Sequence, residues 1–519
     1  MQEDKIISRK KKSVISWRAW HKWVGMFFVP FILIFCVSGI ILNHRQLFSS
    51  YGLSRWWMPT EYHIENWNQG SVKGTLKVDD GLIAYGQMGV WKTDPNFECW
   101  KDFNNGITQG IDNRKISNVV RTSDGILWCA GLYDAYRYNK NSSKWEPLLL
   151  PNNDERISDI ALRGDTVVVL SRSTIYEAVA PEYSFVECPI KKTEGFDNKV
   201  TLFKTVWMLH SGELFGICGK LIVDAMGIVL IILCITGLVF FVLTYTIKYK
   251  KGDGIDVRRQ TGWMKWNLRW HNRLGAGCII LTVLLAVTGM CLRPPLMIPL
   301  ALTKISPLPG STLSDDNVFH DKLRGIRWDA NMHSWLLSTS EGFFSISDDL
   351  HNSVAVKITQ APPVSPMGIN VFCRNPKEKN AWLIGSFSGL FSWNIKTNLI
   401  TDYFTGAPVV KSHGKPVATH PVTGITLDLS SVSGEPVIFE YSASQSAKMP
   451  SMPDILKNQP MSLWNFALEL HVGRCYEPFL GSVFSVLFVF VSGLLLSLIL
   501  ISGYIIYRRC RRREKQLSC

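Results

Sequence analysis

The chain has 519 residues, of which 46% are hydrophobic, and its formal net charge is +14. This length exceeds that of one ordinary domain. The basic surplus is local, because residues 1–22, 248–273 and 508–515 hold 21 Lys and Arg against 5 Asp and Glu. The rest of the chain is close to neutral, which argues against a nucleic-acid-binding protein and favours a membrane protein with basic flanking segments.

Four apolar runs are close to the ~20 residues that a helix needs to cross a bilayer. They are Val24–Leu42, Leu221–Val242, Cys278–Met290 with its apolar flanks, and Leu480–Tyr507. We therefore predict four membrane-spanning helices. The third is cut short by Arg293-Pro294-Pro295 unless it begins near Leu274. The first run is too long for a signal-peptide core and no A-x-A-like site follows it, so we expect it to remain as an anchor.

The three basic segments fall on one side of this four-helix path, and the positive-inside rule makes that side cytoplasmic. We therefore expect a bacterial inner-membrane protein with both termini in the cytoplasm and two large segments in the periplasm. The predicted order is 1–22 basic N-terminus, 23–43 first membrane helix, 44–205 first periplasmic segment, 206–247 periplasmic-edge helix and second membrane helix, 248–270 cytoplasmic loop, 271–293 third membrane helix, 294–465 second periplasmic segment, 466–507 periplasmic-edge helix and fourth membrane helix, and 508–519 basic tail.

The two halves of the chain are related. WHKWVG at Trp20–Gly25 matches WHNRLG at Trp270–Gly275, and Ser38-Gly39 and Thr288-Gly289 follow at the same distance. A second pair, LHSGELF from Leu209 and LHVGRCY from Leu470, precedes the second and fourth apolar runs. These matches indicate a duplicated unit made of a helix, an external segment and a helix.

The external segments repeat on a shorter scale, with strand-like runs separated by Gly and Asn/Lys/Ser turns. Units of roughly 35–45 residues with paired aromatic residues are typical of β-propeller blades. Candidate blades lie near 73–103, 116–150, 157–190, 323–357, 368–404 and 416–442. The pattern predicts one six-bladed β-propeller shared between both segments; the alternative is two separate small mixed domains.

The cysteine spacing does not predict a disulfide pattern. Six of the twelve lie in the external segments, where disulfides are feasible, but their irregular spacing predicts no pairing and none forms a CxxC motif.

Five of the eleven histidines lie at predicted helix ends: His21, His44, His210, His271 and His471. A histidine at a membrane span is costly unless it faces the helical bundle and has a partner; the alternative is an interfacial histidine among lipid headgroups. The duplication places His21 and His271 at matching cytoplasmic ends, where they can meet. Two facing imidazoles in a helical bundle are a standard way to hold haem iron.

On the outer side the candidates are His44, His210 and His471, of which one haem needs two. His21 and His44 are 23 residues apart, which is about 34 Å along a helix and roughly 140° around it, so they do not share a face. If both bind haem, the two haems lie near opposite membrane surfaces. Asp224, near the start of the second apolar run, faces a haem pocket, a helix partner or the outer headgroup layer.

The motifs WHKWVG with Ser38-Gly39, Leu209–Gly237, WHNRLG with Thr288-Gly289, and LHVGRCYEP from Leu470 resemble the PepSY-associated transmembrane-helix family. The most similar members are inner-membrane di-haem proteins, among them reductases that release iron from imported ferric siderophores. The resemblance implies two b-type haems held by helix-end histidines. His21, His210 and His271 fall on the shared motifs, whereas His44 and His471 rest partly on location. The blade-like repeats differ from the small α/β PepSY modules usual in the family, which leaves the substrate open.

Our hypothesis is a haem-containing reductase that passes electrons from a cytoplasmic or quinol donor to a periplasmic ferric siderophore or other iron chelate. Hard oxygen chelators hold iron(III) tightly and release iron(II). The donor is a separate molecule, because no GxGxxG or P-loop motif stands out in the cytoplasmic segments. The alternative is a non-redox membrane sensor or scaffold whose propeller binds a ligand or another envelope protein. No catalytic residue can be named from the sequence.

Overall fold

The computed structural model describes residues 2–152, 155–191, 198–363, 365, 368–409, 420–429, 435–441 and 449–517. The chain divides into two compact units, each assembled from separate stretches. The helical unit comprises Met1–Phe48, Asn198–Ser314 and Leu463–Cys519, and the β unit comprises Ser49–Asp197 and Asp315–Ser462. The chain therefore leaves the helical unit and returns to it twice, as the predicted duplication requires.

Five long helices make up most of the helical unit: α1 (Gln2–Asn43), α4 (Gly216–Gly252), α5 (Arg258–Gly277), α6 (Ile279–Met290) and α11 (Ser482–Leu517). Three candidate membrane spans are long and apolar enough to cross a bilayer, namely Trp17–Asn43, Glu213–Gly252 and Ser482–Arg512. Helices α5 and α6 pass the same test only as a pair, which is bent by 65°. Three spans are thus present among the described residues, or four if the bent pair counts as one.

The segment 248–270, expected as a loop, is largely helical. Helix α4 continues to Gly252 and α5 begins at Arg258. The buried Asn267 side chain of α5 donates a hydrogen bond to the Thr236 carbonyl of α4, at 2.7 Å. This contact ties α5 to α4 within the segment predicted to connect the second and third membrane helices.

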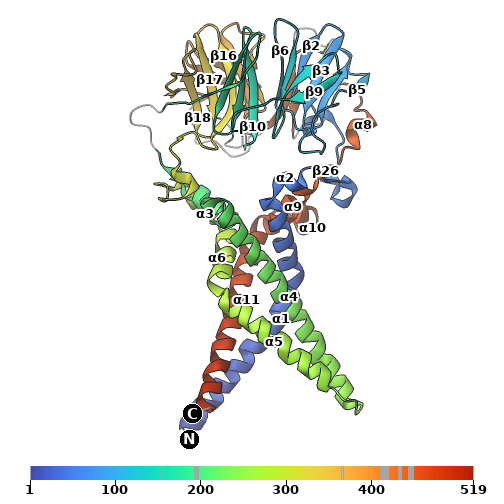
Figure 1. The fold of residues 1–519 in the computed structure, drawn as a ribbon, viewed down its shortest axis with the longest axis vertical. Helices are drawn as coiled ribbons and strands as arrows, with labels where there is room; N and C mark the ends of the chain where they lie inside the picture. The colour runs from blue at the N-terminus through green and yellow to red at the C-terminus, as the bar shows by residue number, and fades with distance from the viewer. Residues whose placement is uncertain are drawn as a thin grey trace. The chain divides into compact units, whose positions relative to one another are not determined.

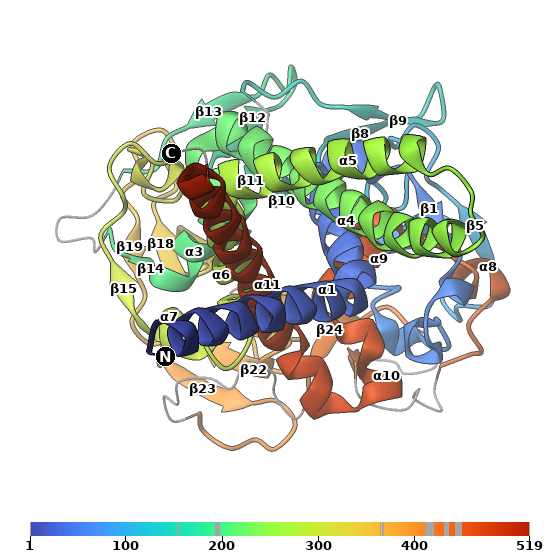
Figure 2. The same ribbon diagram turned by 90° about the horizontal axis from the view of Figure 1, so that it is seen from below.

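Short elements complete the helical unit. They are α2 (Arg45–Phe48), α3 (Leu202–Ser211), η4 (Glu213–Phe215), α7 (Met297–Leu302), η5 (Thr312–Ser314), α9 (Leu463–His471), η7 (Arg474–Tyr476), α10 (Glu477–Leu480), and the paired strands β14 (Val200–Thr201) and β15 (Lys304–Ile305). Helix α1 packs against α4, α9 and α11, α5 lies along α4, and α6 contacts α3 and α11 (Figure 2).

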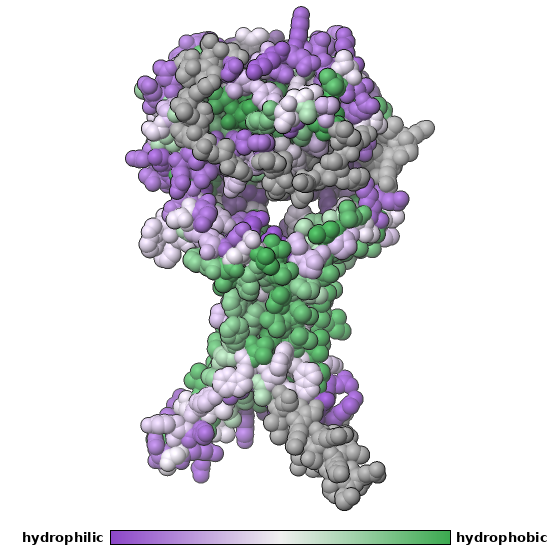
Figure 3. All heavy atoms as spheres, turned by 180° about the vertical axis from the view of Figure 1, so that it is seen from behind, coloured by the Kyte–Doolittle hydropathy of each residue, from purple (hydrophilic) through white to green (hydrophobic). Residues whose placement is uncertain are grey.

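The core of the bundle is apolar, and so is much of its surface. Phe28, Ile32, Leu230 and Ile499 are buried between α1, α4 and α11. Large apolar side chains are also exposed around the long helices, as Figure 3 shows. Exposed apolar surface of this extent is typical of a membrane-embedded helical bundle.

The β unit consists of small antiparallel sheets (Figure 1), and in six of them the strands follow one another in chain order. Five sheets have four strands each: β2–β5 (Gly74–Val78, Gly81–Gly86, Gly89–Thr93, Trp100–Asp102), β6–β9 (Asn118–Arg121, Leu127–Ala130, Ala135–Asn139, Lys144–Pro147), β10–β13 (Ile157–Arg163, Thr166–Ser171, Ile175–Val179, Val186–Cys188), β16–β19 (Leu323–Asp329, Ser334–Thr339, Gly342–Ile346, Val356–Lys357) and β20–β23 (Val371–Arg374, Ala381–Ser386, Gly389–Asn394, Leu399–Asp402). The sixth pairs β24 (Val422–Thr426) with β25 (Val437–Glu440), and β1 (Gly52–Leu53) pairs with β26 (Met461–Ser462).

Five of the six repeat units predicted from the sequence coincide with the four-stranded sheets, and the sixth, 416–442, contains β24 and β25, with residues 416–419, 430–434 and 442 lying outside the described residues. Tight turns link the strands, and some need glycine. Gly89 begins β4 at φ 100°, where a side chain would collide with the Asn104 carboxamide. That carboxamide bonds both the N–H and the carbonyl of Val90, so it fixes the start of the strand.

Consecutive sheets contact one another, and the contacts return to the first sheet. Strand β6 contacts β2, β10 contacts β6, and β16 contacts β10. Phe343 and Phe372 join the fourth and fifth sheets, with ring centres 5.8 Å apart. Strand β24 contacts β20 on one side and β2 on the other. The two halves of the chain therefore contribute three sheets each to one continuous set.

Candidate functional site

The first candidate pair is His21 of α1 and His271 of α5. Their ring centres are 6.4 Å apart and their planes are inclined by 77°. The Nδ1 atom of His21 lies 3.0 Å from the Ile499 carbonyl and 3.1 Å from Ser502 Oγ, both on α11. The Nδ1 atom of His271 lies 2.9 Å from Thr236 Oγ1 on α4. The structure therefore brings together the two histidines that the repeated motif singled out.

The second pair is His210 of α3 and His471 of α9, whose ring centres are 6.3 Å apart with planes inclined by 55°. The Nδ1 atom of His210 lies 3.1 Å from the Leu285 carbonyl and 3.2 Å from Thr288 Oγ1. The Nδ1 atom of His471 lies 2.9 Å from Ser38 Oγ. Of the three outer candidates, the structure pairs these two.

Each of the four hydroxyl groups precedes a glycine on a long helix, and the glycine makes room for the imidazole. A Cβ atom at Gly289 would lie 2.8 Å from His210 Cε1, and one at Gly503 would lie 2.9 Å from His21 Cε1. At Gly39 the same distance to His471 is 3.4 Å, and at Gly237 it is 3.8 Å to His271. The sequence reasoning used Ser38-Gly39 and Thr288-Gly289 but missed Thr236-Gly237 and Ser502-Gly503. Ser/Thr-Gly pairs in the helical segments were the available signal, but α5 and α11 also contain Thr261-Gly262 and Ser492-Gly493, so the pair alone does not identify these residues.

The hydroxyl contacts also decide which ring nitrogen carries the proton. Thr236 and Thr288 donate their own hydroxyl protons to carbonyls one turn back, at 2.7 and 2.8 Å, and Ser38 and Ser502 do likewise. These oxygens are therefore acceptors toward the imidazoles, and a carbonyl such as that of Leu285 can only accept. All four histidines thus carry their proton on Nδ1 and present an Nε2 lone pair.

Burial keeps the second pair neutral. It lowers the pKa of His210 to about 4 and the pKa of His471 to about 3. Two neutral rings that both donate through Nδ1 have only an acceptor atom left, and two acceptors cannot hydrogen-bond to each other. Two such Nε2 atoms have the chemistry of a pair of histidine ligands to a metal ion, each ring being oriented through the contact of its Nδ1 atom.

The ring separations suit one metal atom between two imidazoles. With metal–nitrogen bonds of about 2.0 Å, the ring centres of two ligands on opposite sides are roughly 6 Å apart. Both observed separations, 6.4 and 6.3 Å, match this value. The two pairs therefore have nearly the same ring spacing and the same arrangement of Nδ1 contacts.

A cavity of about 450 Å³ lies beside the first pair, between α1, α4, α5 and α11. Its walls are mainly apolar, with Leu230 and Leu500 among them, and the glycines of both WHxxΦG motifs, Gly25 and Gly275, line it. Arg18 and Lys22 supply positive charge. An apolar cavity with two imidazoles and nearby cations fits a planar, carboxylate-bearing macrocycle such as haem.

His44 belongs to neither pair. Its Nε2 atom lies 2.7 Å from Asp224 Oδ2, and the Asn43 side chain donates to Asp224 Oδ1 at 2.9 Å. Asp224 is buried on α4, so its carboxylate has a helix partner, the second of the three alternatives left open by the sequence. The engaged Nε2 atom makes His44 a structural link between α1 and α4.

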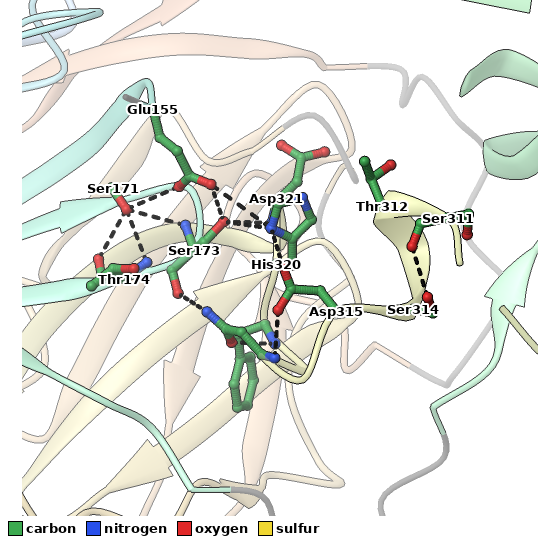
Figure 4. Close-up of polar contacts among 12 residues, drawn as sticks. Glu155, Ser171, Ser173, Thr174, Ser311, Thr312, Ser314, Asp315, His320 and Asp321 are labelled. Atoms are coloured by element: carbon green, nitrogen blue, oxygen red, sulfur yellow. Dashed lines mark hydrogen bonds and ion pairs between the residues drawn. The ribbon is translucent and has the colours of Figure 1, made fainter. Parts of the chain in front are cut away.

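A polar cluster in the β unit surrounds His320 (Figure 4). Ser173 Oγ lies 3.5 Å from His320 Nδ1 and donates to Glu155 at 2.6 Å, and Asp315 lies 3.6 Å from the same nitrogen. Hydroxyl and carboxylates share one ring nitrogen, whereas a nucleophilic relay needs them on opposite nitrogens. The cluster therefore serves to join the β11–β12 turn to the segment before β16.

The fold and the paired histidines define a membrane protein with a helical bundle and a large, mostly β unit. The chain belongs to the PepSY-associated TM region family, which matches residues 3–244 and again residues 241–509. The two matches correspond to the two halves of the predicted duplication, and they confirm the resemblance seen in the motifs. No curated protein matches the chain.

Solved structures show only weak similarity. The extracellular domain of a hybrid two component system from B. thetaiotaomicron aligns at 11% identity and a TM-score of 0.31, covering 66% of this chain and 30% of that one. A second structure of a B. thetaiotaomicron extracellular domain gives 12%, 0.31, 66% and 30%. The computationally designed Ika8 protein aligns at 8% identity and a TM-score of 0.28, covering 70% of this chain and 67% of that one. The chain spans less than a third of the first two, and none of these similarities carries a functional argument.

Proposed function

We propose that this protein is a di-haem reductase of the bacterial inner membrane that passes electrons outward to a ferric siderophore or a related iron chelate in the periplasm. The observation that carries the proposal is the presence of two histidine pairs with ring centres 6.4 and 6.3 Å apart, in which every Nδ1 atom contacts an acceptor on another helix.

The ligands would be His21 with His271, and His210 with His471. Arg18 and Lys22, which line the cavity of the first pair, would bind the carboxylates of the macrocycle. A b-type haem supplies reversible one-electron transfer when it is bound. Each imidazole is oriented by a contact between its Nδ1 atom and a hydroxyl group on a different helix, namely α11, α1, α6 or α4.

Membrane topology supports the outward direction. The first pair lies toward the basic segments, which the positive-inside rule assigns to the cytoplasm. The proposal treats α5 and α6 as one bent span, so that four spans return both termini to that side. Addition of one electron converts iron(III) to the larger, less acidic iron(II), which hard oxygen ligands release. A cytoplasmic or quinol donor would supply the electron.

The proposal includes a six-bladed propeller for the β unit. Six small antiparallel sheets in chain order, with contacts that run from each to the next and from the last to the first, support it. In a closed ring every sheet would have a neighbour on both sides, and each half of the chain would supply three of the six sheets.

The first experiment is the absorption spectrum of protein purified in mild detergent after expression with haem supplied. We expect a Soret band, a dithionite-sensitive α band and about two haems per chain. His21→Ala and His271→Ala should each remove the same haem and the same low-spin EPR signal. His44→Gln is the matched control and should keep both haems, since glutamine can still donate to Asp224.

Absence of a Soret band would overturn the proposal and favour a non-redox sensor or scaffold. Loss of different haems in the His21 and His271 variants would refute their pairing. Substrate is tested separately by stopped-flow mixing of the reduced protein with a ferric siderophore. His210→Ala should abolish the fast reoxidation seen with the native protein, and unchanged reoxidation in a variant that lacks its second haem would overturn the outward direction.

A further inference from the structure

A cavity of about 530 Å³ lies within the β unit and is lined by the first strand of all six sheets. Residues of β2, β6, β10, β16, β20 and β24 contribute to its wall. Each of these strands is the edge strand of its sheet. Residues of these six edge strands therefore surround the cavity. All six repeats thus contribute residues to the wall of one cavity.

The wall of this cavity is strongly cationic. Five cationic residues line it, against two carboxylates, Asp159 and Asp428. The cations are Lys73, Lys77, Arg324, Arg327 and Arg374. Both carboxylates are already engaged, since Asp159 accepts from Arg327 at 2.6 Å and Asp428 accepts from Thr75 at 2.6 Å. Two of the other cations have acidic neighbours outside the cavity wall: Arg374 pairs with Asp329 at 2.9 Å, and Asp321 acts on the charge of Arg324.

Two donors in the wall have no partner among the described residues. The Lys73 ammonium makes no hydrogen bond or ion pair with them, although Asp159 is near enough to act on its charge. Arg374 donates through Nη2 to Asp329 at 2.9 Å, but its buried Nη1 atom has no partner in the part of the chain that the structure describes. Its guanidinium lies 4.1 Å from the centre of the Trp382 ring, which holds the plane in place. Buried cationic donors are costly when unpaired and are usually retained for a ligand.

We infer that this cavity binds a small organic anion that carries at least two carboxylate or phosphate groups. One acidic group would accept from Lys73 and another from Arg374, whose planar fork suits carboxylate and phosphate oxygens. A volume of about 530 Å³ is within the range of small-molecule sites. The inference is independent of the haem proposal, because every residue of the cavity belongs to the β unit.

The test is isothermal titration of the full-length protein in detergent, with citrate, inorganic phosphate and glucose as probes. We expect citrate to bind, with an affinity that falls as salt is added, and glucose not to bind. Phosphate separates the two chemistries: if it binds more tightly than citrate, the ligand is a phosphate compound rather than a carboxylate. Equal, salt-independent signals from citrate and glucose would overturn the inference.

Lys73→Met is the decisive variant. It keeps an unbranched side chain of similar length and removes a buried unpaired charge, so the protein should become more heat-stable while citrate affinity falls by about tenfold or more. Lys101→Met, on the exposed strand β5 outside the cavity, should change neither. Unchanged citrate affinity in Lys73→Met would refute the site. Arg374→Lys, which keeps the charge but loses the unpaired Nη1 donor, provides a second variant with the same expected loss.

Discussion

At the scale of single residues, the four ligand candidates share one local design. An imidazole from one helix rests on a glycine of another, and the hydroxyl oxygen of the residue before that glycine accepts a hydrogen bond from Nδ1–H. The glycines beside the first histidine pair, Gly503 and Gly237, differ in how closely the imidazole ring approaches them. Gly503 leaves no room for a methyl group, since its Cβ would lie 2.9 Å from His21, whereas at Gly237 the distance to His271 is an ordinary 3.8 Å.

This difference makes a matched pair of variants. Gly503→Ala should displace His21 and lower occupancy of the haem proposed to lie between His21 and His271, while Gly237→Ala should leave it intact, because only the first methyl group overlaps the ring. Haem per chain and the amplitude of the low-spin EPR signal measure the effect. Equal haem content in the two variants would show that glycine contact does not position the ligand.

A second residue-scale prediction concerns pH. Burial lowers the pKa of Lys73 to about 8 from the ordinary 10.5; Arg327 adds to the lowering and Asp159 opposes it. Lys77, Arg324, Arg374, Asp428 and Tyr85 also line the cavity. Since Lys73 loses its charge near pH 8, citrate affinity should weaken as the pH rises from 7 to 9.

The effect of the same group on stability has the opposite sign. Between about pH 8 and 10.5 the unfolded chain holds a proton on Lys73 that the folded chain has released, so this residue favours the folded state more as pH rises. Lys73→Met should remove both dependences. Titrations and thermal melts at pH 7, 8 and 9 measure them, and a citrate affinity that stays constant across this range would exclude Lys73 as the ligand's partner.

At the scale of elements, the start of α4 is tied to the end of α1 by one carboxylate. Asp224 binds both the Asn43 amide and the His44 ring. Asp224→Ala would leave two partly buried polar groups without their acceptor and should lower stability by about 2 kcal/mol. Thermal unfolding in detergent measures the loss, and Asp224→Asn, which keeps an acceptor oxygen, should lose less.

The haem content should be unaffected by Asp224→Ala, because neither histidine pair contacts this carboxylate. A variant that melts normally but lacks a haem would assign Asp224 to a haem site instead.

The bend between α5 and α6 is another feature of this scale. It occurs at Cys278, directly after the Gly-Ala-Gly sequence 275–277, where low helix propensity permits a break.

At the scale of the whole molecule, the β unit depends on both halves of the chain. One hydrophobic cluster joins Val168 and Leu170 to Phe319 and Trp335, and another joins Trp67 and Trp91 to Phe439. Both seams between the halves are therefore apolar. Residues 49–197 expressed alone should aggregate or remain partly unfolded, because they expose the two seams and the edges of their strands.

Co-expression of 49–197 with 315–462 should restore a soluble complex of one copy each. Circular dichroism, thermal melts and size-exclusion chromatography distinguish the outcomes, and the helical unit is not needed for this comparison. A soluble, monomeric and cooperatively folded 49–197 fragment would contradict the shared architecture and favour two independent domains.

Much of this organisation can be predicted from local patterns in the sequence. The apolar runs reveal the spans because bilayer thickness fixes their length, and strand repeats reveal the sheets because each repeat supplies its own turns and paired aromatics. WHxxΦG identified His21 and His271 because duplication placed them equivalently. Tertiary structure alone decided the partner of His210, since that choice depends on how the short helices α3 and α9 dock, and His471 lies 261 residues away. It also decided the acceptors of Nδ1, the partner of Asp224 and the convergence of cations in the β unit, because all of these join side chains from distant segments that no local pattern relates.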